Sequence, residues 1–114
     1  MSKAQRDKGK RGERRWAAWL QCLGLLVKST VETGNVGHDE EIGADLALVD
    51  FNPPLRFQCK EMARNCPSPR AMLERAHIVG VHFTEGSWAT RDVLIMRADV
   101  FAELARKVAK GAEV

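Results

Sequence analysis

Four polar residues in three separate segments are of types that can hold a divalent cation or activate water. They are Glu13, Asp45, Gln58 and Lys60. Carboxylate and amide oxygens suit hard cations such as Mg²⁺. A lysine ammonium beside them can orient a water molecule and offset charge on a phosphate. If the fold brought them together, they would suit metal-assisted chemistry on an anionic substrate.

Each of these residues also has a purely structural explanation. Glu13 precedes Trp16 by one turn of an expected helix, where the helix dipole stabilises a first-turn glutamate by about 0.3 to 1 kcal/mol. Asp45 opens an apolar strand, as the aspartate of an Asx turn does, although a buried carboxylate needs a partner. Gln58 and Lys60 alternate with other residues, as on a solvated sheet face. The sequence leaves both explanations open.

The segments between these residues carry helical and strand patterns. Four apolar residues keep the spacing of one helical face: Trp16, Trp19, Leu20 and Leu23. They predict a helix from about Lys10 to Cys22 that stops at Gly24. The remaining pattern predicts strands at 25–32, 44–50 and 55–62, a helix at 69–77 capped by Ser68, strands at 79–85 and 91–97, and a final helix from a candidate cap at Asp99 to about Lys110.

We expect the second and third strands to pair as a hairpin, and the last two strands to do the same. The order α-β-β-β-α-β-β-α then predicts an α/β (α+β) domain in which helices cover a mixed sheet. A chain of 114 residues suits a single domain, 1–114, preceded by a basic N-terminal arm at 1–12.

The net charge of +3 conceals a polarised distribution. Residues 1–15 hold seven basic and two acidic side chains, whereas residues 31–50 hold six acidic side chains and no Lys or Arg. This pattern suits a protein that binds a polyanion with one part and a cation with another. A solvated basic tail and a solvated acidic loop would give the same distribution.

The three cysteines match no zinc spacing, and we expect Cys22 and Cys59 to be buried, reduced thiols. No apolar run approaches the length of a membrane span, about 20 residues. No signal-peptide pattern follows the basic N-terminus. These observations favour a cytoplasmic location. The sequence assigns no role to His77 or His82, and it leaves base stacking or sheet packing open for Trp88.

The stretches GKRGERRW (9–16) and QCK (58–60) resemble the PD-(D/E)XK nuclease superfamily. Within it, the first stretch resembles the archaeal-type and phage-type Holliday junction resolvases, in which a basic GxRxE-like segment supplies the first carboxylate. The resemblance covers most of the chain, because the expected element order follows that family's plan. It implies a restriction-endonuclease-like core and a homodimer.

The resemblance assigns Glu13, Asp45, Gln58 and Lys60 to the catalytic positions. It implies that Mg²⁺ or Mn²⁺ is held by Glu13, Asp45, Gln58 and the backbone carbonyl of Cys59. The family usually has Glu or Asp where this chain has Gln58, although VRR-type nucleases also show QxK. Losing that charge weakens cation binding unless a loop acid assists. The candidates are Asp39, Glu40 and Glu41.

The implied function is metal-dependent endonuclease cleavage of four-way DNA junctions, in the cytoplasm of a bacterial or phage-infected cell. Five basic residues are expected to contact DNA phosphates: Lys8, Lys10, Arg11, Arg14 and Arg15. Three alternatives stay open: a restriction-type or repair-type nuclease acting on flaps or single strands, a catalytically inactive DNA-binding protein of the same fold, and a basic protein-interaction module.

Overall fold

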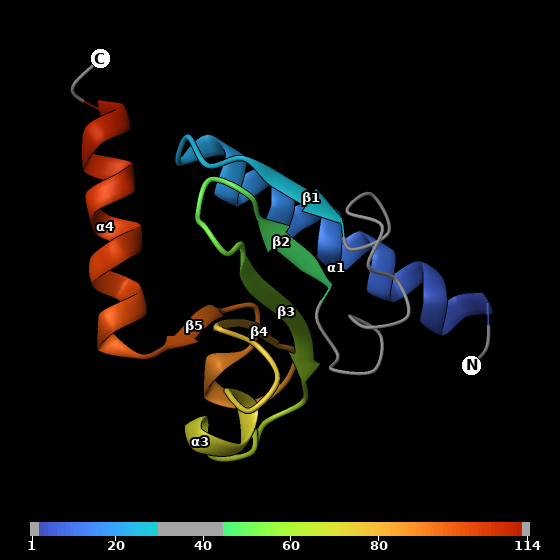
Figure 1. Cartoon of the computed structure of the whole chain (residues 1–114). Coiled ribbons are helices and arrows are strands. Elements are labelled where there is room, and N and C mark those ends of the chain that lie inside the picture. Colours follow the sequence, from blue (N-terminus) through green and yellow to red (C-terminus); the bar gives the residue numbers. More distant parts are fainter. Residues whose placement is uncertain (1–2, 30–44, 113–114) are drawn as a thin grey trace.

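The computed structural model describes residues 3–29 and 45–112, with side chains over 11–29 and 45–110, and five strands within these ranges form one mixed sheet (Figure 1). The strands are β1 (Val27–Ser29), β2 (Leu46–Leu48), β3 (Leu55–Met62), β4 (Ile78–Phe83) and β5 (Asp92–Met96). They lie side by side in chain order. β3 and β4 are parallel, and every other neighbouring pair is antiparallel. Both expected hairpins are therefore confirmed.

Three helices accompany the sheet in the described residues: α1 (Lys3–Cys22), α3 (Pro69–Met72) and α4 (Ala98–Ala112). A short 3₁₀ turn, Gly86–Trp88, joins β4 to β5. Within the described residues the order is α-β-β-β-α-β-β-α, as expected, so the α+β class is confirmed. None of the helices in these ranges combines the length and apolarity needed to cross a bilayer.

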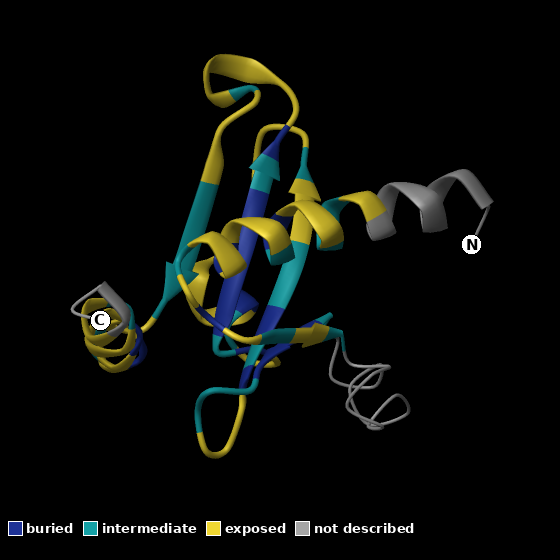
Figure 2. Cartoon of the chain, turned by 90° about the horizontal axis from the view of Figure 1, so that it is seen from above, coloured by how far each residue is buried: buried dark blue, intermediate teal, exposed yellow. Residues whose placement is uncertain are grey.

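The face of the sheet under α1 holds the larger core cluster (Figure 2). Trp16 and Leu20 of α1 are buried, and the Trp16 ring lies 5.5 Å from that of Phe57. Gly80 of β4 lies beneath both rings, and a Cβ there would come within 2.7 Å of Trp16 and 2.8 Å of Phe57. The missing side chain at Gly80 therefore sets how closely α1 approaches the sheet.

The opposite face holds a second cluster, which includes Met72 of α3 with Val79, Val81 and Phe83 of β4. β4 is therefore packed on both faces, as strands in parallel pairings usually are. This explains its nearly continuous apolar sequence. The two clusters also separate odd and even positions of β3, which matters for the candidate site.

α1 begins at Lys3, seven residues before the predicted start, so most of the expected arm, 3–12, is helical. Lys, Arg, Gln and Ala are good helix formers, and they outweigh two glycines that each cost about 1 kcal/mol. The predicted end is confirmed. Gly24 has a φ of 87°, and Leu25 donates to the carbonyl of Leu20, which is the Schellman arrangement.

The predicted helix at 69–77 ends early, at Met72. Its cap is confirmed, since the Ser68 hydroxyl accepts from the Ala71 N–H at 3.3 Å. Beyond the helix, His77 is bonded to β3. Its N–H donates to the Arg56 carbonyl at 3.0 Å, and its Nδ1 accepts from the Arg56 N–H at 2.9 Å.

Other local expectations are corrected. Asp99 lies in the first turn of α4 and pairs with Arg97 at 2.9 Å rather than preceding the helix as its cap. Cys22 is exposed, and Cys59 is half-buried. The strands predicted at 25–32 and 44–50 are confirmed over β1 and β2, whereas the predicted loop with Asp39, Glu40 and Glu41 lies outside the described residues.

The bond between His77 and Arg56 gives an expected pH dependence. Partial burial, followed by the charges of Arg56 and Arg97, lowers the pKa of His77 below its ordinary 6.5. As the pH falls below 6.5, the unfolded chain takes up a proton that the folded protein refuses, so the folded state loses stability. His77→Asn keeps an acceptor without titrating. We expect the wild type to lose about 0.5 kcal/mol more than this variant between pH 7.5 and 5.5, a small effect because the ring is partly exposed.

Urea unfolding of both proteins at the two pH values measures this difference. Every other titrating group is common to both, so the comparison isolates His77. Equal losses would show that the Nδ1 bond does not control the protonation of His77.

Candidate active site

Asp45 is fixed against the middle of β3 by two hydrogen bonds. Its N–H donates to the Phe57 carbonyl at 3.1 Å, and its Oδ2 accepts from the Cys59 N–H at 2.8 Å. The β2–β3 ladder ends at the pairing of Leu46 with Phe57. The Asp45 carboxylate thus serves the next N–H of β3 in place of a ladder partner. Gln58 lies between the two residues that Asp45 contacts.

The carboxylate of Asp45 is held in a costly environment. Burial raises its pKa, and the Cys59 hydrogen bond and the charge of Lys60 offset only part of that effect. A desolvated carboxylate of this kind is stabilised by a cation. The Asx-turn explanation requires no such burial, so the environment favours a functional role for Asp45.

Glu13 approaches the same point from α1. It is half-buried and lies one helical turn before the buried Trp16, on the side that faces the sheet, as predicted. Burial, followed by the charges of Asp45 and Glu13, raises the pKa of the Cys59 thiol, and Arg15 opposes this. The thiol therefore stays protonated. Because Glu13 and Asp45 both act on the Cys59 thiol, these residues, distant in sequence, lie near the same point of β3.

Gln58 and Lys60 share one face of β3, as the alternation predicts. They lie opposite Val79 and Val81, whereas Cys59 lies opposite Gly80 under α1. Glu13 therefore reaches the site from the other face of the sheet. Asp45 lies against the edge of β3 where the pairing with β2 has ended, and it interacts with residues of both faces. It accepts a hydrogen bond from Cys59, whose side chain lies under α1, and the charge of Lys60, on the other face, lowers its pKa.

A cavity of about 340 Å³ lies beside this point, between α1, β3 and β4. Arg11 and Arg15 line it from the helix, Cys59 and Lys60 from β3, and His82 from β4. A larger cavity, about 640 Å³, lies between α4 and the segment 50–55, and it contains none of the four predicted residues. The smaller cavity is the relevant one because two residues of the predicted site, Cys59 and Lys60, line it.

The predicted DNA contacts lie within α1 rather than around its start. Arg11, Arg14 and Arg15 are exposed, whereas the side chains of Lys8 and Lys10 lie outside the described residues. The sequence pattern missed that Arg15 is partnered. Its Nη1 donates to Asp92 Oδ2 at 2.7 Å.

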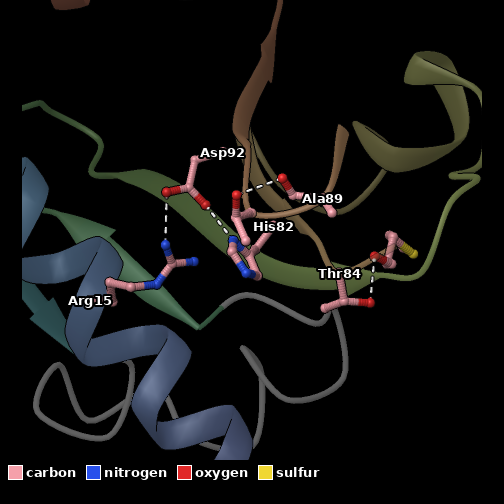
Figure 3. Close-up of polar contacts among 7 residues, drawn as sticks. Arg15, His82, Thr84, Ala89 and Asp92 are labelled. Carbon is pink, nitrogen blue, oxygen red and sulfur yellow. Dashed lines mark hydrogen bonds and ion pairs between the residues drawn. The ribbon is translucent and has the colours of Figure 1, made fainter. Parts of the chain in front are cut away.

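Asp92 also binds His82, which the sequence reading left without a role. Oδ1 of Asp92 lies 2.8 Å from His82 Nδ1, so one carboxylate joins α1, β4 and β5 (Figure 3). Burial acts to raise the pKa of Asp92, but the hydrogen bonds from Arg15 and His82 prevail and lower it. The hairpin predicted for the last two strands could have indicated this pair. In the register that the structure shows, His82 lies opposite Asp92.

The oxygen donors at the site suit a hard cation. They are the carboxylates of Glu13 and Asp45, the amide oxygen of Gln58 and the Cys59 carbonyl, which points to the same strand edge as the N–H that Asp45 bonds. Over residues 3–29 and 45–112, no three His, Cys, Asp or Glu side chains form a metal-binding group. Glu13 and Asp45 are the two carboxylates that act electrostatically on Cys59.

The predicted site thus has oxygen donors and an ammonium group on β3, next to a cavity lined by two arginines. That combination is suited to hydrolysis of a phosphate ester. Comparisons of the chain with protein-family models, curated proteins and solved structures gave no match.

Proposed function

We propose that this protein is a Mg²⁺-dependent or Mn²⁺-dependent, structure-specific DNA endonuclease of the PD-(D/E)XK type, and that it resolves four-way junctions in the cytoplasm of a bacterial or phage-infected cell. The observation that carries the proposal is the position of Asp45. A desolvated carboxylate bonded to the Cys59 N–H lies within the electrostatic reach of Lys60, and Glu13 acts on the same strand residue.

The chain's own residues divide the work. Glu13, Asp45, the Gln58 amide oxygen and the Cys59 carbonyl would hold the cation. When bound, the cation supplies Lewis acidity toward the phosphate and lowers the pKa of a coordinated water. Lys60 orients or deprotonates the attacking water and offsets charge that develops on the phosphate.

Binding of DNA rests on the exposed arginines of α1. Arg11, Arg14 and Arg15 offer guanidinium donors to backbone phosphates, which fixes the duplex arms without reading sequence. A four-way junction has two strands to cut, so a two-fold homodimer would supply two sites in matching geometry. A monomer in light scattering at micromolar concentration would argue against junction resolution.

A second candidate is an inactive DNA-binding protein of the same fold. Gln58 in place of an acid favours it, because fewer carboxylates weaken binding of divalent cations. Action on flaps or single strands is a further alternative. Trp88 suits that role, since it packs edge-on against Phe83 yet is 54% exposed and able to stack on a base.

Cleavage of a four-way junction, a flap and a linear duplex of shared sequence, with and without Mg²⁺, tests these functions. We expect Mg²⁺-dependent cutting of the junction, and Lys60→Ala should reduce its rate by at least about 100-fold while DNA binding remains. Lys110→Ala, at the distant end of α4, is the matched control. Cutting by Lys60→Ala at the wild-type rate contradicts the assignment, and binding without cleavage by the wild type supports the inactive protein.

A further inference from the structure

Asp92 divides its two carboxylate oxygens between two cationic or ionisable side chains. Oδ2 accepts from Arg15 Nη1 at 2.7 Å, and Oδ1 lies 2.8 Å from His82 Nδ1. The three residues come from β5, α1 and β4, which are distant in sequence (Figure 3). Both oxygens are committed, so the position of each partner depends on Asp92.

The partners of Asp92 line the cavity between α1, β3 and β4. Arg15 and His82 both line it, together with Arg11, Lys60 and Glu61. The guanidinium groups of Arg11 and Arg15 thus border a space that holds one carboxylate, that of Glu61. This excess of positive charge favours an anion. The side chains of Arg15 and His82 are 46% and 27% exposed, so a ligand can reach them.

The bonds to Asp92 determine which donors are left for a ligand. A carboxylate only accepts, so His82 places a proton on Nδ1, and Nε2 is the ring nitrogen that remains. The other charged groups around the ring are Arg11 and Arg15 of α1, and Lys60 and Glu61 of β3. The Arg15 guanidinium has five N–H donors, and Nη1 spends one on Asp92.

We propose that Asp92 is a positioning residue that holds Arg15 and His82 together at one phosphate-binding site, which takes a backbone phosphodiester next to the one that is cleaved. The N–H groups of Arg15 that Asp92 leaves free are the donors of this site. This inference rests on the proposed function, since it supplies that function with its anion subsite. Arg15 comes from helix α1 and His82 from strand β4. Binding of DNA therefore depends on a residue that itself repels phosphate.

This dependence predicts that loss of the Asp92 charge weakens DNA binding, whereas simple electrostatics predicts tighter binding. Removing an acidic residue near bound DNA should tighten binding if charge alone matters. Asparagine has one acceptor oxygen, so Asp92→Asn loses the bond to Arg15 or the bond to His82. We expect its affinity for junction DNA, without Mg²⁺, to fall roughly fivefold to tenfold, and the slope of log K against log salt to become about one unit shallower.

Asp99→Asn is the matched control, because Asp99 pairs with Arg97 at 2.9 Å but lies at the start of α4. It removes the same charge and should leave the affinity unchanged or slightly higher. Unchanged or tighter binding by Asp92→Asn would overturn the inference while leaving the endonuclease intact. If wild-type protein binds no DNA, the proposed function itself fails.

The first of two further measurements needs neither DNA nor a variant protein. Inorganic phosphate at millimolar concentration should shift the His82 ring signals of the wild-type protein in NMR spectra, and His77 should respond less. His82→Gln should then weaken DNA binding severalfold. A His82 ring that is insensitive to phosphate, or a His82→Gln variant with wild-type affinity, rejects the site.

Discussion

Replacing Asp45 with asparagine is expected to abolish cleavage and, at the same time, to make the fold more stable. The asparagine oxygen can still accept from the Cys59 N–H, so the local hydrogen bond is retained. The substitution removes a charge that burial destabilises, as shown by the raised pKa of Asp45. We expect a gain of about 1 kcal/mol in the free energy of unfolding in EDTA, or roughly 3 to 6 °C in Tm.

The loss of cleavage follows from the same charge. A cation that polarises phosphate supplies several kcal/mol to the transition state. Losing one of its carboxylates should therefore cost at least about 100-fold in rate. Asp50→Asn is the control, since Asp50 also accepts from a backbone N–H at 2.8 Å, that of Leu26, at an exposed position. It should cleave normally and gain no stability.

Thermal unfolding with and without Mg²⁺ provides a reading that is independent of activity. A ligand that binds only the folded state raises its stability according to its concentration and Kd. Mg²⁺ should therefore raise the Tm of the wild type and of Asp50→Asn, but not that of Asp45→Asn. If all three respond equally, the cation does not bind at Asp45.

The sequence was most informative where a local pattern sufficed. The strand 55–62 is confirmed to the residue, because prolines precede it and its alternation is regular. The start of α1 was missed because its charged residues favour a helix without forming an apolar stripe. Trp19, predicted on that stripe, is 42% exposed because the strip of helix that contacts the sheet is narrow.

The candidate site needed information that no single segment holds. The resemblance to a nuclease family assigned Glu13, Asp45, Gln58 and Lys60 to one site. Only the strand register shows that Gln58 and Lys60 lie on the face of β3 opposite to that of Cys59, which lies under α1. Asp92 was missed because its partners lie 77 and 10 residues away along the chain. The features that could not be predicted are contacts between residues distant in sequence, because residue types alone do not reveal such contacts.

The approach of α1 to the sheet connects stability to the site. α1 carries Glu13 and Arg15, and its buried Trp16 rests above Gly80 against Phe57. Aromatic rings in a packed core cannot bend away from a new atom, so the helix itself has to move. A displacement of α1 would withdraw one carboxylate and the arginine held by Asp92 together.

Gly80→Ala is therefore expected to damage both stability and cleavage. Its Cβ would lie 2.7 Å from Trp16 and 2.8 Å from Phe57, closer than packed carbon atoms come. We expect a loss of about 3 kcal/mol in urea unfolding, the upper end for overpacking, and a Tm lower by about 10 °C or more. Cleavage measured well below that Tm should still be slower than in the wild type, because Glu13 has moved.

Two further variants separate the clash from a general effect of alanine. Gly12→Ala, also a glycine-to-alanine change, has no atom within 4 Å of its new Cβ and should stabilise α1 by about 0.5 to 1 kcal/mol. Phe57→Leu destabilises by itself, but in the Gly80→Ala background it removes one of the clashing rings. The double variant should therefore lose at least 0.5 kcal/mol less, roughly, than the sum of the single losses. If the two losses in free energy of unfolding simply add, Gly80 does not control how closely α1 approaches the sheet.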